Sequence, residues 1–182
     1  MNSIVFVTGN KRKIGEAKLS CDLFNIKVDS RQVAIDEIQS HDPLVIAKDK
    51  AEKAYESIKL PLVVNDAFWN IPSLNGFPGG YMKDVADWFS AKDFISIMQD
   101  KDDKRVIITD CVVYKDSKTL KVFSKNFIGE IGNKPRGSGN SIEQVAIFNG
   151  LTLAEHHDLN QFSEQPIDQV WYDFATWFIK QK

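Results

Sequence analysis

The sequence predicts an α/β protein with a mixed central sheet, because short apolar runs alternate with segments of helical periodicity. Residues 4–7 form a β-branched run, and residues 11–23 then place apolar side chains at helical spacing. A second helix is expected over 43–58, where Pro43 fits the first turn. The apolar run 62–64 follows as the next strand. Strand–helix units in this order are typical of parallel strand pairing.

The rest of the chain adds antiparallel features to this pattern. Two longer strand patterns cover 105–114 and 119–131, and the polar residues 116–118 between them predict a hairpin turn. The Gly- and Pro-rich segment 70–80 predicts a loop, after which a helical pattern covers 82–98. Since βα units and a hairpin occur in one chain, we expect a mixed sheet flanked by helices.

The composition is that of an ordinary globular protein. Of the 182 residues, 43% are hydrophobic and 26% are charged, so the chain can bury a sizeable core. We expect one domain over residues 1–182. The net charge of -2 provides no basic field, and no basic patch with interleaved aromatic residues is visible. Both observations argue against a nucleic-acid-binding protein.

The sequence shows neither a secretory signal nor a membrane-spanning run. Its apolar start reaches polar residues after Val7, which is too short for either kind of segment. Cys21 and Cys111 lie far apart and have no zinc-ligand spacing, which is typical of buried thiols in a reducing compartment. We therefore expect a cytoplasmic protein that binds no membrane.

The turn after the first strand is a candidate phosphate-binding loop. Gly9 permits close approach of the backbone, Thr8 and Asn10 can hydrogen-bond phosphate oxygens, and Lys13 adds positive charge. The following helix would present its N-terminus to the anion. An ordinary strand-to-helix turn followed by solvated lysines fits the same residues.

Three carboxylates form a second candidate group. Asp36 and Glu37 precede the helix expected over 43–58, and Asp66 follows a buried strand. Hard oxygen ligands of this kind suit Mg²⁺, and a carboxylate can also activate a water molecule. The alternative is that Asp36 and Glu37 are solvated loop charges and Asp66 caps a turn.

An apolar stripe marks the end of the chain. The segment 166–180 carries its large side chains on one helical face, which predicts an amphipathic helix. The aromatic members of that stripe are Trp171, Phe174, Trp177 and Phe178. We interpret the stripe as core or subunit interface rather than as a surface that stacks on a base.

Several motifs, in order along almost the whole chain, resemble those of the inosine/xanthosine triphosphate pyrophosphatases. Thr8-Gly9-Asn10-x-x-Lys13 matches the opening T-G-N-x-x-K of that family, and Lys50-Ala51 falls on its K-A. The remaining similar segments are Glu37-Ile38-Gln39, Asn65-Asp66, Leu74-Asn75-Gly76-Phe77-Pro78-Gly79-x-Tyr81, Phe127-Ile128-Gly129-Glu130-Ile131, Pro135-Arg136-Gly137 and Thr152-x-Ala154-Glu155.

The resemblance implies a fold and a reaction. The fold is an elongated mixed sheet in two lobes, with a nucleotide cleft between them, in a homodimer. The reaction cleaves a nucleoside triphosphate to a monophosphate and pyrophosphate with Mg²⁺, which removes non-standard purines. By position, Thr8, Asn10 and Lys13 would bind phosphates, and Lys50 and Asp66 would be catalytic.

The resemblance also implies a metal site and a base-binding site, and both are altered. Glu37 and Asp66 would bind the metal together with Asn65, which replaces an acid of the family. An asparagine can ligate through its carbonyl oxygen, but it brings no charge. The base-binding positions are Asn140, Ile142, Glu143, Glu164 and Gln165.

The changes at the base-binding positions predict a change of substrate. Where the family has an aromatic residue this chain has Asn140, and where it has S-H-R this chain has Ser163-Glu164-Gln165. His and Arg donate to a base carbonyl, whereas an ionised Glu164 can only accept. We therefore expect specificity to shift away from ITP and XTP, toward a base that presents an N–H group.

Two functions remain open from the sequence. The phosphate loop, Glu37, Lys50 and Asp66 favour a Mg²⁺-dependent pyrophosphatase with altered specificity. The replacements at Asn65, Asn140, Glu164 and Gln165 favour a weakened or inactive member of the fold that binds a nucleotide or a protein.

Overall fold

The computed structural model describes residues 2–159 and 165–181. The α-helices are α1 (Lys11–Cys21), α2 (Pro43–Ile58), α3 (Met82–Trp88), α4 (Ala91–Met98), α5 (Leu153–Asp158) and α6 (Val170–Phe178). The strands are β1 (Asn2–Val7), β2 (Ile26–Arg31), β3 (Leu62–Ile71), β4 (Phe77–Gly79), β5 (Arg105–Lys115), β6 (Leu120–Ile131), β7 (Ala146–Phe148) and β8 (Leu151–Thr152). Short 3₁₀ helices cover Asp22–Phe24, Pro72–Leu74 and Pro166–Asp168.

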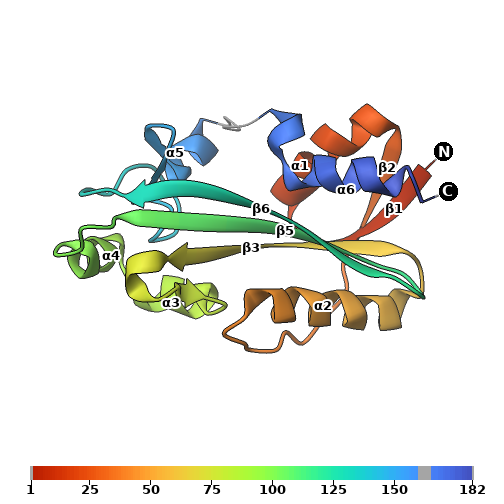
Figure 1. Ribbon diagram of the computed structural model, residues 1–182, viewed down its shortest axis with the longest axis horizontal. Helices are drawn as coiled ribbons and strands as arrows, with labels where there is room; N and C mark the ends of the chain where they lie inside the picture. Colours follow the sequence, from red (N-terminus) through yellow and green to blue (C-terminus); the bar gives the residue numbers. More distant parts are fainter. Residues whose placement is uncertain (1, 160–164, 182) are drawn as a thin grey trace. The chain divides into compact units, whose positions relative to one another are not determined.

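The strands form one mixed eight-stranded sheet (Figure 1). Its order is β2-β1-β3-β5-β6-β7-β8, with β4 paired to β3. Strand β1 pairs in parallel with both β2 and β3, whereas β4 is antiparallel to β3 and β7 is antiparallel to β6 and β8. The predicted mixed α/β class is therefore confirmed.

The chain divides into two compact units. The first contains the described residues of Met1–Ala67, Asp110–Lys125 and Glu164–Lys182, and the second contains those of Phe68–Thr109 and Asn126–Ser163. Each unit has its own hydrophobic core. Strands β3, β5 and β6 contribute residues to both units. The expectation of a single domain over 1–182 stays a prediction.

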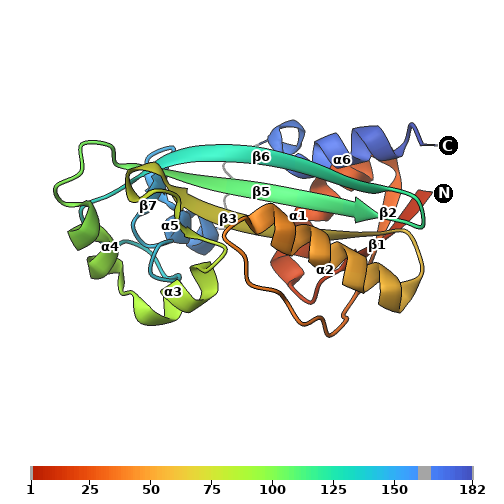
Figure 2. The same cartoon turned by 60° about the horizontal axis from the view of Figure 1, so that its bottom comes forward.

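In the first unit, helices lie on both faces of the strands. Helices α1 and α6 cover one face and α2 covers the other (Figures 1 and 2). Strand side chains alternate between the faces, so Ile4 and Phe6 join the core beneath α1 and α6. Trp171 and Phe174 of α6 are buried in that core, where each contributes about 2–3 kcal/mol through its buried apolar area. The prediction that the aromatic stripe is core is confirmed for these two residues.

In the second unit, α4 supplies much of the core. Phe94 and Met98 are fully buried, and they share a cluster with Ile71, Val106 and Ile142. The hydrophobic side chains of α4 lie on one face, as helical spacing requires. No helix among residues 2–159 and 165–181 is long and apolar enough to cross a bilayer.

Two elements differ from the sequence expectation. The helical pattern 82–98 is two helices, because the hydroxyl and backbone of Ser90 form a capping box with Asp93 and so begin α4 as a new helix. The strand expected over 62–64 continues to Ile71, since Trp69 and Ile71 bury their side chains in the second unit. Asp66 is therefore within a strand and does not cap a turn.

Candidate functional site

A pocket of about 580 Å³ lies in the first unit, beyond the carboxyl ends of the parallel strands β1 and β2. Ligand sites of α/β sheets commonly lie at such strand ends, and the volume suits a small-molecule ligand. The loop after β1, the segment after β2, helix α2 and strand β3 each supply part of its wall. The lining residues are Val7, Thr8, Gly9, Asn10, Lys13, Gln32, Val33, Ala34, Ile35, Glu37, Lys50 and Asn65.

The predicted phosphate loop uses its own polar groups to build the start of α1. The Asn10 side chain accepts hydrogen bonds from the backbone N–H groups of Arg12 (2.9 Å) and Lys13 (3.4 Å), and so caps the helix. The N–H of Asn10 in turn donates to Thr8 Oγ1 at 3.1 Å. The N–H groups of Arg12 and Lys13 are therefore already paired with the Asn10 side chain. Among the described residues, no acceptor contacts the N–H of Gly9 or Lys11, and these two remain able to bind an anion.

Gln32 is a pocket residue that the sequence analysis missed. It follows β2, and its side chain lies directly over Gly9, since a Cβ atom at Gly9 would approach Gln32 Nε2 to 2.0 Å. A side chain at position 9 would therefore displace the end of the Gln32 side chain. Strands β1 and β2 are parallel, so the residues that follow them lie at the same edge of the sheet. A prediction of this parallel pairing from the sequence would have placed Gln32 beside Gly9.

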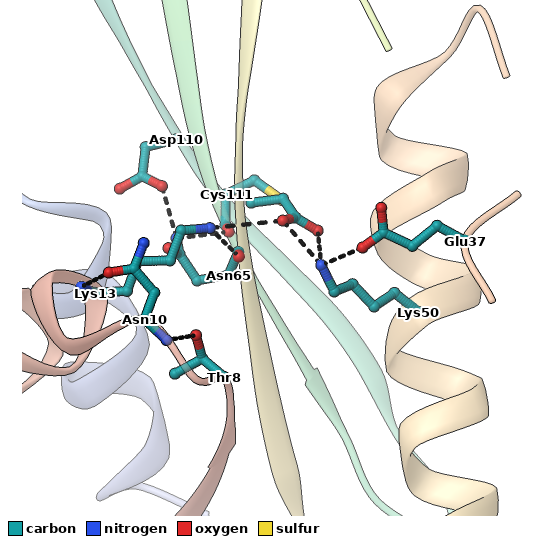
Figure 3. Close-up of polar contacts among 9 residues, drawn as sticks. Thr8, Asn10, Lys13, Glu37, Lys50, Asn65, Asp110 and Cys111 are labelled. Atoms are coloured by element: carbon teal, nitrogen blue, oxygen red, sulfur yellow. Dashed lines mark hydrogen bonds and ion pairs between the residues drawn. The ribbon is translucent and has the colours of Figure 1, made fainter. Parts of the chain in front are cut away.

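Lys50 of α2 joins the two predicted metal-binding carboxylates. Its Nζ lies 2.7 Å from Glu37 Oε1 and 3.1 Å from Asp66 Oδ1 (Figure 3). Burial lowers the pKa of Lys50, but the charges and hydrogen bonds of Asp66 and Glu37 outweigh burial, and the pKa lies above its ordinary value. Lys50 is therefore a fixed cation at neutral pH and not a proton acceptor.

Lys13 brings a second ammonium group to Asp66. Its Nζ donates to the backbone carbonyl of Asn65 at 2.7 Å and lies 3.6 Å from Asp66 Oδ1. Both Lys13 and Asp66 keep about a fifth of their side-chain surface exposed, so solvent and ligands can reach them. The structure therefore brings together Lys13, Lys50, Glu37 and Asp66, as the sequence predicted.

Asn65 and Asp66 point their side chains to opposite faces of β3, as adjacent strand residues must. Asp66 meets Lys50 on the α2 side. The Asn65 amide is buried, and its Nδ2 donates to Asp110 Oδ1 at 2.6 Å and to the carbonyl oxygen of Cys111 at 3.0 Å (Figure 3). The NH₂ group of Asn65 is thus bonded to β5.

Asp110 is the second residue that the sequence analysis missed. Every second residue of β5 points toward the core, and Asp110 is one of these residues. The other inward-pointing residues of the series are buried and apolar or aromatic: Val106, Ile108, Val112 and Tyr114. A charged residue at an inward position is a signal that a strand pattern can reveal. Burial raises the pKa of Asp110 above its ordinary value, and the Asn65 amide and Lys13 only partly oppose that effect.

The donor set fits a hard divalent cation in its chemistry. Glu37 and Asp66 offer carboxylate oxygens around one point, and Asn65 offers an amide oxygen. In the structure the Lys50 ammonium lies between the two carboxylates. Within the described ranges, no three Asp, Glu, His or Cys side chains gather closely enough to hold a metal by themselves. A cation here would share the carboxylates with Lys50 and complete its shell from water or substrate.

The predicted base-binding residues lie elsewhere in the chain. Asn140 and Glu143 belong to the second unit, where they bond each other reciprocally, Glu143 N to Asn140 Oδ1 and Asn140 N to Glu143 Oε2. The side chain of Ile142 is fully buried in the core of that unit and so faces no ligand. Gln165 is exposed and precedes the 3₁₀ helix Pro166–Asp168, whereas Glu164 lies outside the described residues. A role of this set in reading a base stays a prediction.

Comparison with known proteins identifies similar sequences and folds. The model of the Ham1 family matches residues 4–156. A dITP/XTP pyrophosphatase of Methanosarcina acetivorans is 28% identical over 183 residues and is covered completely, as is this chain. Inosine triphosphate pyrophosphatase 2 of Trypanosoma cruzi is 30% identical over 162 residues, which cover 86% of this chain and 82% of the relative. A solved HAM1 protein from Coxiella burnetii has the same fold, with a TM-score of 0.81 at 19% identity over 99% of this chain and 100% of its own.

Proposed function

Since the chain belongs to the Ham1 family, we propose that it hydrolyses a nucleoside triphosphate to a monophosphate and pyrophosphate, with Mg²⁺ as cofactor. The names of its relatives, dITP/XTP and inosine triphosphate pyrophosphatases, support this reaction class. The observation that carries the proposal is the contact of both Lys13 and Lys50 with Asp66 beside a pocket of suitable size.

The lysines bind and orient the triphosphate in this proposal. The described structure has two ammonium groups on one carboxylate, and a triphosphate can take either ammonium as a stronger partner. The N–H groups of Gly9 and Lys11 and the Thr8 hydroxyl then donate to phosphate oxygens. Lys50 stays protonated and offsets negative charge that develops during the reaction.

Asp66 has the chemistry for the proton transfer. A water oxygen forms a bond to the α-phosphorus while the bond from that phosphorus to the β-bridging oxygen breaks, which releases pyrophosphate. The proton of the water passes to the Asp66 carboxylate. Asp66 is the carboxylate that faces both lysines, so release of one lysine to substrate leaves it a free oxygen for this role.

Mg²⁺ would be held by Glu37 and Asp66, with the Asn65 carbonyl oxygen as a neutral ligand. When bound, it would supply positive charge beside the phosphate oxygens. This assignment leaves one negative charge fewer than a site with three carboxylates. We therefore expect a weaker affinity for Mg²⁺, with binding at millimolar rather than micromolar concentrations, on the order of the looser oxygen-ligand sites.

The specificity proposal rests on Glu164 and Gln165. An acceptor at 164 disfavours a base carbonyl, so hydrolysis of ITP and XTP should be slower than that of a triphosphate whose base presents an amino group. The discriminating experiment is release of pyrophosphate from a panel of purine and pyrimidine triphosphates, with and without Mg²⁺. The variant E164H/Q165R should raise kcat/KM for ITP about tenfold or more while leaving the protein folded.

The same panel distinguishes the enzyme from a binding protein. Turnover that D66N abolishes supports the enzyme. Tight nucleotide binding by a folded wild-type protein without turnover of any member supports the binding function instead. Faster hydrolysis of ITP than of every amino-purine triphosphate refutes the shifted specificity.

We also propose a homodimer, which light scattering after gel filtration tests directly.

A further inference from the structure

We propose that Asp110 is a positioning residue, which holds the Asn65 amide so that its carbonyl oxygen is presented to the ligand in the pocket. This inference rests on the proposed function, because it assigns that oxygen to the divalent cation. Neither the reaction nor the family relation identifies Asp110, which lies on β5 and does not line the pocket.

The orientation of the Asn65 amide follows from what its neighbours can accept. Its Nδ2 lies 2.6 Å from Asp110 Oδ1 and 3.0 Å from the Cys111 carbonyl oxygen. The carbonyl oxygen of Cys111 can only accept, and the Asp110 oxygen accepts beside it, so the NH₂ group must face them and the amide cannot be reversed. The Oδ1 atom is consequently directed away from both.

The carbonyl oxygen of Asn65 is available to a ligand. Among the described residues, no donor bonds Asn65 Oδ1. Asn65 Oδ1 is also absent from the solvent-inaccessible side-chain atoms that have no hydrogen-bond partner. The oxygen is therefore accessible, although Asn65 as a residue is only 5% exposed. Asn65 is one of the residues that line the pocket, and Oδ1 is its side-chain acceptor without a bonded donor, so we assign this atom to the ligand.

Asp110 also changes the character of that oxygen. A carboxylate that accepts from an amide N–H polarises the amide and increases the negative charge on its carbonyl oxygen. The neutral Asn65 therefore acquires part of the ligand strength of a carboxylate. The negative charge itself remains one hydrogen bond behind, on β5.

Retaining a carboxylate at position 110 has a cost for the fold. Neighbouring positions on that face of β5 are Ile108 and Val112, which are buried and apolar. A valine at 110 would restore the alternation and remove a desolvated charge. A purely structural role thus predicts that D110V loses stability, whereas a positioning role predicts that it keeps or gains stability and loses function.

The experiment compares D110V and D110N in wild-type and N65A backgrounds. Three quantities are measured: melting temperature, Mn²⁺ affinity of the full chain by electron paramagnetic resonance, and half-maximal Mg²⁺ for pyrophosphate release. We expect D110V to melt at or above the wild-type temperature and to bind Mn²⁺ about 10-fold more weakly, the usual effect of losing an orienting partner. D110N, which can still accept from Asn65, should lose less than D110V.

The double variants decide whether Asp110 acts through Asn65. In the N65A background, D110V should change Mn²⁺ affinity less than about twofold, because the amide it orients is absent. An effect of D110V that is as large in N65A as in the wild type overturns the proposal. So does a D110V protein that binds Mn²⁺ normally, or a wild-type protein that binds none.

A matched control separates the proposed effect of Asp110 on Mn²⁺ affinity from a general effect of losing an aspartate. Asp116, at the end of the same strand, accepts from the Tyr114 hydroxyl and from two backbone N–H groups of the hairpin. D116N should lower the melting temperature without changing Mn²⁺ affinity. If the wild-type chain hydrolyses no triphosphate, the proposed function fails, while the Mn²⁺ and stability measurements still test the role of Asp110.

Discussion

Replacing Lys50 with Met removes the ammonium that lies between Glu37 and Asp66, and its consequence can be worked out from the distances. At 3.1 Å, the attraction between Lys50 and Asp66 is about 5 kcal/mol for an effective dielectric constant of about 20. Desolvation of the partly buried ammonium offsets most of this, and Glu37 adds little because half of its side chain is exposed. We expect K50M to lose about 1–2 kcal/mol, since it leaves two carboxylates without a cation.

The assay is thermal unfolding with and without Mg²⁺. A loss of 1–2 kcal/mol in a chain of this length lowers the melting temperature by roughly 2–8 °C. Mg²⁺ should restore at least about half of that loss, because the vacated position between the carboxylates then suits a divalent cation. The same variant should reduce kcat/KM by about 100-fold or more through loss of the phosphate contact.

Lys53 provides the matched control on the same helix. It pairs with Asp49 and donates to the backbone carbonyl of Asp36, at a more exposed position. K53M should change stability by less than about 0.5 kcal/mol, with no response to Mg²⁺ beyond that of the wild type. A K50M protein that responds to Mg²⁺ no more than K53M does would show that Glu37 and Asp66 do not form a cation site.

Three further predictions concern the loop, the hairpin and the domain structure. G9A should weaken nucleotide binding about three- to tenfold, because the new Cβ displaces the Gln32 amide, which it would approach to 2.0 Å; G9A/Q32A should bind as Q32A does. Hydrogen bonds from the hairpin N–H groups and the Tyr114 hydroxyl outweigh burial and lower the pKa of Asp116, so its stabilising effect is present at neutral pH and lost as the pH falls below about 4. D116N should therefore lower the melting temperature by more at pH 7 than at pH 3. Because β3, β5 and β6 contribute to both units, tryptophan fluorescence and circular dichroism should report one coincident unfolding transition; two separated transitions would contradict the single domain.

Local signals made part of the fold predictable. Helix α2 begins at Pro43 and ends at Ile58, as expected, because Asp42 caps it, Pro43 fits its first turn and its small apolar residues repeat at helical spacing. The apolar runs of β1 and β5 were equally clear, since each buries most of its residues. These are features in which propensity, pattern and burial agree.

The site was predictable in its charged residues and not in their orientation. Lys13, Lys50 and Asp66 come together because the first turn of α1, helix α2 and strand β3 meet there. Asn10 was expected to bind phosphate, and its side-chain oxygen has a second use, because Oδ1 caps α1; donation from its Nδ2 to phosphate stays a prediction. The Asn65 amide, by contrast, bonds Asp110, which is distant in sequence, and no local pattern encodes that choice.

The alternation of β3 explains why Asn65 meets β5 while Asp66 meets Lys50. Asp66 faces α2, where Lys50 already balances its charge, and a new carboxylate on that side would add repulsion. Asn65 faces the other side of the sheet. Strand β5 is the next strand after β3 in the sheet order, and its residue Asp110 contacts Asn65. A same-face position on that strand can reach the Asn65 amide without entering the pocket, and Asp110 has that position. The neutral amide at 65 and the buried carboxyl at 110 thus form one hydrogen-bonded pair, whose coupling the N65A and D110V cycle measures.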